Sequence, residues 1–401
     1  MKIFKVLLVV AIALGMMACN NEQDVPEISG EKDASISIKV YPSSNGSGLR
    51  SVGDLSVTDA TTPVGLAEES AIKQLEVWVF SGDVLTGYGS AQGDEVTNVE
   101  AIAGESSVVV VANANIGIKV SMADLLDEVN GLPTDISTNG LVMTAKPIVV
   151  TLKAGNNYYG YTEAEVTATV GEAKTTLSTT PLEITRVNAR VAIVSAVLDL
   201  NSVPETQKAV FTHLGDIEVA MFNVPNQTKL FGPSLAINTA FQFGAKWASP
   251  DVAYVGADVA ESVSNPTLYD AVVDANALPI VSSKAPFYYV NENTSTEDAQ
   301  KMFIVLRAKV YKGSDPVTSL VDLYTDKDGY TYYPVWVNKD GISAPSGSIG
   351  DGNVYRNTQY NISLTIKGLG NPSIDDVDKA FLDVKVEVAP WNVVTQEVTW
   401  E

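Results

Sequence analysis

Cysteine and histidine are almost absent from this chain of 401 residues, which contains one cysteine, Cys19, and one histidine, His213. The chain beyond Cys19 therefore cannot form a disulfide or a thiolate metal site, and it offers no cysteine for a histidine to activate. His213 lies in the mixed apolar run Val210-Phe-Thr-His-Leu, so we interpret it as structural. We expect no catalytic residue, no metal site and no cofactor, and hence no enzyme.

Positive charge is also scarce, since 26 lysines and arginines face 48 acidic residues and the formal net charge is -22. Such a charge argues against binding to nucleic acid or adsorption to anionic lipid. It favours a soluble protein that resists unspecific association before any assembly.

Three stretches have the composition of ligand sites without the required spacing. Residues 322–329 are rich in carboxylates but lack EF-hand spacing and a terminal glutamate, so a hairpin turn is the better interpretation, and calcium binding stays open. Residues 347–352 resemble a phosphate loop only in their glycines. An aromatic cluster could grip a sugar or a peptide, although such clusters more often cover a sheet face; it comprises Tyr330, Tyr332, Tyr333 and Trp336.

The N-terminus has the features of an export signal. Lys2 and Lys5 precede an apolar run over residues 6–14, which is shorter than the ~20 residues that span a bilayer. A cysteine then follows a small residue, the arrangement that a bacterial lipoprotein signal peptidase requires. We therefore predict cleavage between Ala18 and Cys19 and lipidation of Cys19.

A short strand and an exposed bond follow this signal. Residues 20–33 have the polar composition of a tether, whereas Ile36, Ile38 and Val40 alternate with polar residues as in a half-buried strand. The glycine- and serine-rich residues 42–50 then predict a loop that would enter a protease cleft. The loop ends at Arg50, whereas the other arginines lie in or beside apolar alternating runs; they are Arg186, Arg190, Arg307 and Arg356. We predict cleavage between Arg50 and Ser51, with an ordinary linker as the alternative.

The rest of the chain predicts an all-β fold, because short β-branched or aromatic runs alternate with turn residues. In the first run, residues 73–80, we expect Leu75, Val77 and Val79 on one face and Trp78 and Phe80 on the other. One short amphipathic helix is expected within residues 120–129. A domain boundary is expected near residue 185. The other expected strands are 108–112, 147–153, 158–170, 182–198, 217–223, 286–291, 302–311, 331–338, 359–367 and 381–388.

The C-terminus carries a candidate donor strand. Residues 383–388 alternate cleanly, Pro390-Trp391 interrupts the pattern, and residues 392–401 resume it up to the end. A terminal strand after a proline break can leave its own domain. The apolar side chains that we assign to the groove of a neighbouring molecule are those of Val394, Val398 and Trp400.

These features together resemble the FimA-like major fimbrial subunit family, the type V pilins of Gram-negative bacteria. The resemblance rests on Cys19 with the strand and loop to Arg50, and on three sequences, Leu182-Glu-Ile-Thr-Arg-Val-Asn-Ala-Arg-Val, Tyr355-Arg-Asn-Thr-Gln-Tyr-Asn-Ile and Val384-Lys-Val-Glu-Val-Ala-Pro-Trp391. It implies two transthyretin-like β-sandwich domains, export as a lipidated precursor, cleavage after an arginine and polymerisation by donor-strand exchange. The partners it implies are other copies of the chain, accessory fimbrial subunits, an arginine-specific protease and the outer membrane.

The expected map is a signal peptide at 1–18, a propeptide with a removable strand at 19–50, an N-terminal sandwich at 51–185 and a C-terminal sandwich at 186–401. The expected location is the bacterial surface, in a fimbrium, with the precursor lipid-anchored at the outer membrane. Two alternatives stay open. One is a fimbrial tip or anchor subunit, and the other is a monomeric surface lipoprotein that binds glycan or protein.

Overall fold

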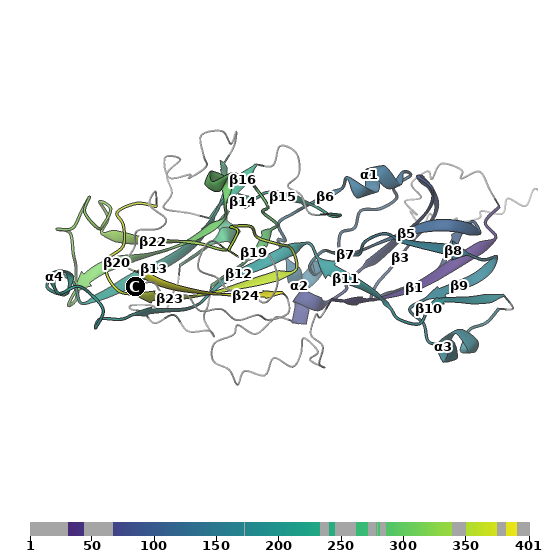
Figure 1. The fold of residues 1–401 in the computed structure, drawn as a ribbon, viewed down its shortest axis with the longest axis horizontal. Helices are drawn as coiled ribbons and strands as arrows, with labels where there is room; N and C mark the ends of the chain where they lie inside the picture. Colours follow the sequence, from purple (N-terminus) through teal and green to yellow (C-terminus); the bar gives the residue numbers. More distant parts are fainter. Residues whose placement is uncertain are drawn as a thin grey trace, which may run out of the picture.

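The computed structural model describes residues 31–43, 67–171, 173–232, 240–244, 262–271, 278, 280, 286–338, 350–374 and 382–390. Its elements form two lobes that follow one another along the long axis (Figure 1). Elements up to β11 make up most of one lobe, and those from β12 to β24 most of the other. The predicted all-β fold with a few short helices is confirmed.

The first lobe is built around one sheet in the order β10-β9-β1-β11-β7-β5-β2-β3, with β4 paired to β1 and β8 paired to β5. Their bounds are β1 Ala34–Pro42, β2 Leu75–Ser81, β3 Val84–Ala91, β4 Glu95–Ala101, β5 Gly104–Ala112, β7 Met143–Thr144, β8 Ile148–Leu152, β9 Gly155–Tyr159, β10 Lys174–Ser178 and β11 Leu182–Arg186.

Strand β2 shows why this lobe has two apolar layers. Leu75, Val77 and Val79 pack into one core cluster, and Trp78 and Phe80 into another. This is the division that the period-two pattern predicted. The first cluster also contains the inward side chains of β1, so the sheet curls around them.

The second lobe is a sandwich of a four-stranded sheet, β19-β12-β23-β24, and a five-stranded sheet in which β13 and β20 are central. One core joins them, with Ile193 and Ile362 from the first sheet and Leu306 and Tyr333 from the second. The bounds in this lobe are β12 Asn188–Leu198, β13 His213–Phe222, β14 Val224–Pro225, β15 Gln227–Lys229, β16 Phe241–Phe243, β17 Ser262–Ser264, β18 Tyr269–Ala271, β19 Phe287–Asn291, β20 Phe303–Lys312, β21 Asp315–Pro316, β22 Tyr330–Trp336, β23 Thr358–Ile366 and β24 Leu382–Pro390.

The helices are short, and one of them corrects the sequence prediction. The helix expected within residues 120–129 is present as α1, Met122–Leu126, whereas the strand expected over 158–170 stops at Tyr159. Helix α3, Glu163–Ala168, follows it because Thr162 and Glu165 form a capping box, in which the Thr162 amide donates to Glu165 Oε2 at 2.8 Å. The others are α2 Ile136–Asn139, α4 Glu205–Lys208, η1 Ala67–Ser70, η3 Pro266–Leu268 and η5 Asp298–Gln300. In the described part of the chain, no helix has the length and apolar character needed to cross a membrane.

A buried polar cluster joins the two lobes around η1. Glu69 is fully buried, and its carboxylate lies 3.1 Å from the guanidinium of Arg190 on β12 and accepts from the Tyr289 hydroxyl of β19 at 2.7 Å. Arg186, at the end of β11, donates from Nε to the Glu69 carbonyl at 2.7 Å and from Nη1 to Asn357 Oδ1 at 3.2 Å. Burial lowers the pKa of Arg186 to about 10. Because both lobes supply partners, the cluster fixes one lobe against the other.

A small two-stranded sheet also bridges the lobes, since β6, Val129–Gly131, pairs with β15 of the second lobe.

Candidate functional site

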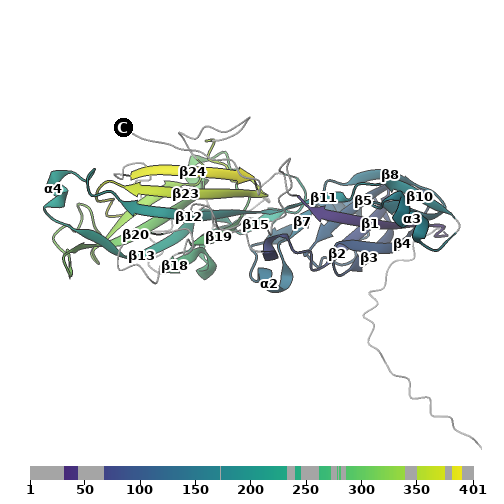
Figure 2. The ribbon, with the colours of Figure 1, turned by 90° about the horizontal axis from the view of Figure 1, so that it is seen from below.

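Strand β1 occupies an interior position in its sheet. Its first half lies between β9, which runs parallel to it, and β4, which runs antiparallel, and its last three residues pair with β11. Figure 2 shows β1 running along the length of the first lobe. Removing β1 would therefore leave three strands, β4, β9 and β11, with unpaired backbone groups.

The apolar side chains of β1 fill the core of the lobe. Ile36 and Ile38 have no exposed surface, and Val40 is 3% exposed. All three belong to the same cluster as Leu75 and Val77 of β2. The predicted strand with these residues facing inward is confirmed.

Polar contacts fix the register of β1. Ser37 is buried, and its hydroxyl accepts a hydrogen bond from the Asn98 amide at 3.0 Å. Asn98 has a positive φ of 54° at the irregularity where β4 shifts register against Ile36 and Ile38. Asn157 of β9 donates to the Ser35 carbonyl at 3.0 Å on the opposite side.

Lys39 clamps the outer face of β1. Its ammonium donates to Glu165 at 2.6 Å and lies 4.3 Å from the centre of the Tyr161 ring. The hydrogen bond from Lys39, with further bonds from Thr162, lowers the pKa of Glu165 to about 2. Burial, reinforced by the bond to Glu95, raises the pKa of Tyr161. The clamp depends on a cation that belongs to β1.

Several predicted site residues lie outside the described part of the chain, namely Ala18, Cys19, Arg50, Ser51, Val394, Val398 and Trp400. The last described element before the predicted donor segment is β24. It pairs with β23 along its whole length, from Leu382 to Pro390, and forms the edge of its sheet (Figure 2).

The aromatic cluster and the single histidine have structural surroundings. Tyr332 and Trp336 pack in an aromatic layer on one face of their sheet, whereas Tyr333 points into the sandwich core, so the interpretation as sheet cover is confirmed. His213 stacks on Tyr311, with ring centres 5.0 Å apart and nearly parallel planes. Asp326 accepts from the Tyr330 amide at 2.9 Å, which closes the turn over 326–330.

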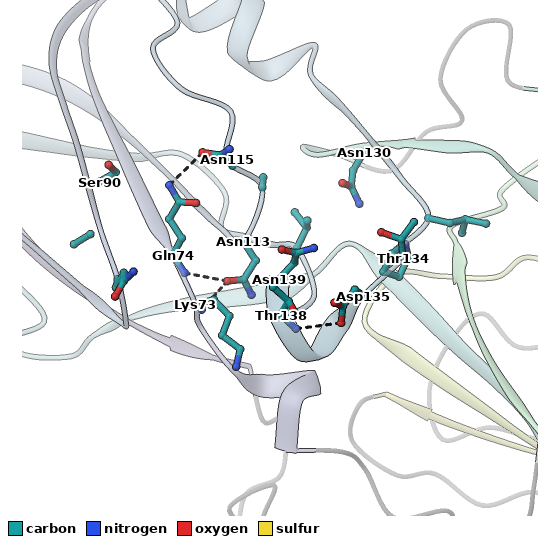
Figure 3. A pocket seen from close by; sticks show the side chains of 17 residues that line it. Lys73, Gln74, Ser90, Asn113, Asn115, Asn130, Thr134, Asp135, Thr138 and Asn139 are labelled. Atoms are coloured by element: carbon teal, nitrogen blue, oxygen red, sulfur yellow. Dashed lines mark hydrogen bonds between the residues drawn. The ribbon is translucent and has the colours of Figure 1, made fainter. Parts of the chain in front are cut away.

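A polar recess of about 800 Å³ was not anticipated from the sequence. It lies beside the ends of β2 and β3 and is lined mainly by amide and hydroxyl side chains (Figure 3). Asp135 is one of its two charged lining residues, and hydrogen bonds from Ser137 and Thr138 lower its pKa to about 2 as it caps α2. No linear motif marks the recess because distant segments form it. The labelled residues in Figure 3 are Lys73, Gln74, Ser90, Asn113, Asn115, Asn130, Thr134, Asp135, Thr138 and Asn139.

Comparison with known proteins identifies the family to which this arrangement belongs. Residues 34–186 match the model of the major fimbrial subunit protein (FimA), and residues 188–391 match that of the FimA4 pilin C-terminal domain. Two relatives from Porphyromonas gingivalis, major fimbrium subunits FimA type-4 and type-2, are 31% and 29% identical, each aligning over 100% of both chains. The crystal structure of a fimbrilin (fimA) from P. gingivalis W83 shares the fold, with a TM-score of 0.69 and 24% identity over 91% of this chain and 99% of the other.

Proposed function

The chain belongs to the FimA family of major fimbrial subunits, and from that premise we propose that it is a shaft subunit of a surface fimbrium. Fimbrial subunits are structural proteins, so the chain is not an enzyme. In this proposal the precursor is lipidated on Cys19, delivered to the outer membrane, cleaved between Arg50 and Ser51, and polymerised by donor-strand exchange. Its partners are further copies of itself, accessory fimbrial subunits and an arginine-specific protease.

The interior position of β1 is the observation that carries this proposal. The strand precedes Arg50 in the sequence, yet it pairs with three strands that follow the proposed cut. Cleavage would break the only covalent link between β1 and the lobe whose core it fills. Three buried apolar side chains at ~1.5–3 kcal/mol each amount to about 5–9 kcal/mol of burial that a replacement strand would recover. Backbone pairing with the exposed edges of β4, β9 and β11 would add to the free energy that favours the replacement strand.

The proposed donor is the segment 392–401, with Val394, Val398 and Trp400 entering the vacated groove. It follows β24, which lies at the edge of its sheet among the described strands, and we propose that its departure removes no central strand of the second lobe. We propose a propeptide at 19–50 and two sandwiches that meet near residue 185. The position of the boundary between the sandwiches is supported by the two family models, which meet between residues 186 and 188.

Deletion of residues 392–401 tests the donor assignment. The truncated precursor should fold, melt cooperatively and be cleaved after Arg50, but it should form no fibres. Val398→Asp provides a milder version, because burial of its carboxylate in an apolar groove would cost several kcal/mol. Arg50→Lys is the matched control for cleavage. It keeps the positive charge but removes the arginine, so an arginine-specific protease should not cut this variant and the protein should stay monomeric.

Two results would contradict the donor assignment. An unfolded truncated protein would show that the strand belongs to its own sandwich. Fibres formed by the truncated protein would show that exchange does not use this segment.

A second candidate function is a monomeric surface protein that binds a glycan, and the polar recess is the observation that favours it. Amides and hydroxyls both donate and accept hydrogen bonds, as sugar hydroxyls do. Size-exclusion chromatography separates the two functions. A monomeric binder should elute unchanged after limited cleavage, whereas a shaft subunit should move to the void volume.

A further inference from the structure

Arginine is rare in this chain and has an unusual distribution. Only five of its 26 basic residues are arginines, and the four beyond the proposed cut are all described by the structure. Arg186, Arg190 and Arg307 are buried, and the side chain of Arg356 is 18% exposed. Arginine is ordinarily a surface residue, so this distribution needs a reason.

Each of the four arginines is held by partners from distant parts of the sequence. Arg186 and Arg190 belong to the cluster around Glu69 between the lobes. Arg307, in the middle of β20, lies 2.7 Å from Glu218 of the neighbouring β13 and 4.0 Å from the centre of the Tyr330 ring.

Arg356 precedes β23 and lies outside regular structure, so its side-chain contacts matter most for its protection. Its Nε and Nη2 both donate to Glu292 Oε2, at 3.0 and 2.8 Å. It also donates to the carbonyls of Leu230 at 3.0 Å and Gly232 at 2.7 Å. Glu292 is only 3% exposed, so the ion pair is largely shielded from solvent.

Lysines provide the exposed cations of the described surface. No described arginine is exposed, whereas six described lysines are, namely Lys32, Lys73, Lys146, Lys153, Lys312 and Lys327. A guanidinium suits buried bidentate pairs, which accounts for arginine at buried positions. It does not account for the lack of arginine at the exposed ones.

We propose that the burial of Arg186, Arg190, Arg307 and Arg356 and the use of lysine at exposed positions protect the mature subunit from the arginine-specific protease that activates it. The inference rests on the proposed cleavage after Arg50 and concerns the specificity of that step. A protease must draw the chain around the cut bond into its cleft as an extended segment. Strand pairing keeps Arg186, Arg190 and Arg307 out of the protease cleft, and the ion pair with Glu292 does the same for Arg356. Each of them becomes accessible only if the structure around it first unfolds locally.

Digestion of the native full-length precursor with an arginine-specific endoprotease, followed by intact mass measurement, tests this protection. We expect one cut, after Arg50, and cleavage at the four other arginines at least about a hundredfold slower, because it requires local unfolding. Two matched variants add one arginine each. Lys327→Arg, in an exposed turn, should create a second cut, whereas Lys309→Arg, within β20, should not.

Glu292→Gln tests the ion pair directly. This variant, checked for native circular dichroism, should gain a cut after Arg356, and adding Arg356→Lys should abolish that cut. An uncut Arg356 in folded Glu292→Gln would overturn the assigned role of the pair.

Two further results would overturn the inference as a whole. One is cleavage of the unmodified protein after any of the four arginines at the rate seen for Lys327→Arg. The other is a Lys327→Arg variant that resists the protease, because exposed arginines would then need no replacement. If Lys327→Arg is cut while Arg50 is not, the proposed processing fails and the protection of the four arginines stands.

Discussion

Replacement of Ile38 by alanine should destabilise the precursor without destabilising the fibre. Ile38 has no exposed surface and packs in the core of the first lobe. Truncation of a buried isoleucine to alanine costs about 2–5 kcal/mol. For a lobe of roughly 150 residues, about 3 kcal/mol corresponds to a fall in Tm of about 6–12 °C. Once β1 has left, however, residue 38 is absent from the polymer and its identity cannot matter.

Leu75→Ala is the matched control. Leu75 is equally buried in the same cluster but lies on β2, which follows the proposed cut. Its truncation also costs about 2–5 kcal/mol of stability, so it should lower the Tm of the precursor and of the fibre by similar amounts.

Differential scanning calorimetry of both variants, before cleavage and after assembly, measures the difference. Strand exchange predicts that the Ile38→Ala precursor has a lower Tm than the unmodified precursor. Fibres of this variant should have the same Tm as fibres of the unmodified protein. Ile38→Ala fibres that are destabilised as much as the precursor would refute it, because β1 would then still be in place.

Three other predictions concern the clamp, the junction and the lipid. The pKa of Glu165 is lowered to about 2 from 4.5, so its carboxylate stabilises the precursor above pH 4.5, and this contribution is lost as the pH falls through 2. Glu165→Gln should therefore flatten the acid limb of the precursor's Tm profile, measured by circular dichroism, and an unchanged slope would argue against the clamp with Lys39. Glu69→Gln leaves Arg190 buried without its carboxylate and should lower the free energy of unfolding by about 3–5 kcal/mol in a urea titration, whereas a loss below about 1 kcal/mol would contradict the ion pair at the junction. Cys19→Ala should remove the precursor from the membrane fraction, and normal surface delivery would rule out lipidation as the attachment.

Periodicity predicted the strands well because one burial rule controls them. In β1 every second side chain enters one core, and in β2 alternate side chains enter two different cores. This alternation is visible within strands of nine and seven residues. The strand predicted over 158–170 failed because its tyrosines and threonines favour strands, while the capping contacts of Thr162 and Glu165 favour a helix start.

The lobe junction and the recess could not be predicted from the sequence, for a different reason. Glu69 meets Arg190 and Tyr289 across more than a hundred residues of sequence, and no local pattern specifies that encounter. The recess likewise gathers amides from separate segments, including Gln74, Asn113 and Asn130, each of which is ordinary in its own stretch.

The central claim is that the place of β1 is taken by a strand from another subunit. A structure of the assembled fibre at side-chain resolution tests it most directly, at the position between β4 and β9. The account predicts subunits that begin at Ser51, with residues 392–401 of an adjacent subunit in that position and Val394, Val398 and Trp400 in its core. Density there for Ile36, Ile38 and Val40 of the same chain would contradict it.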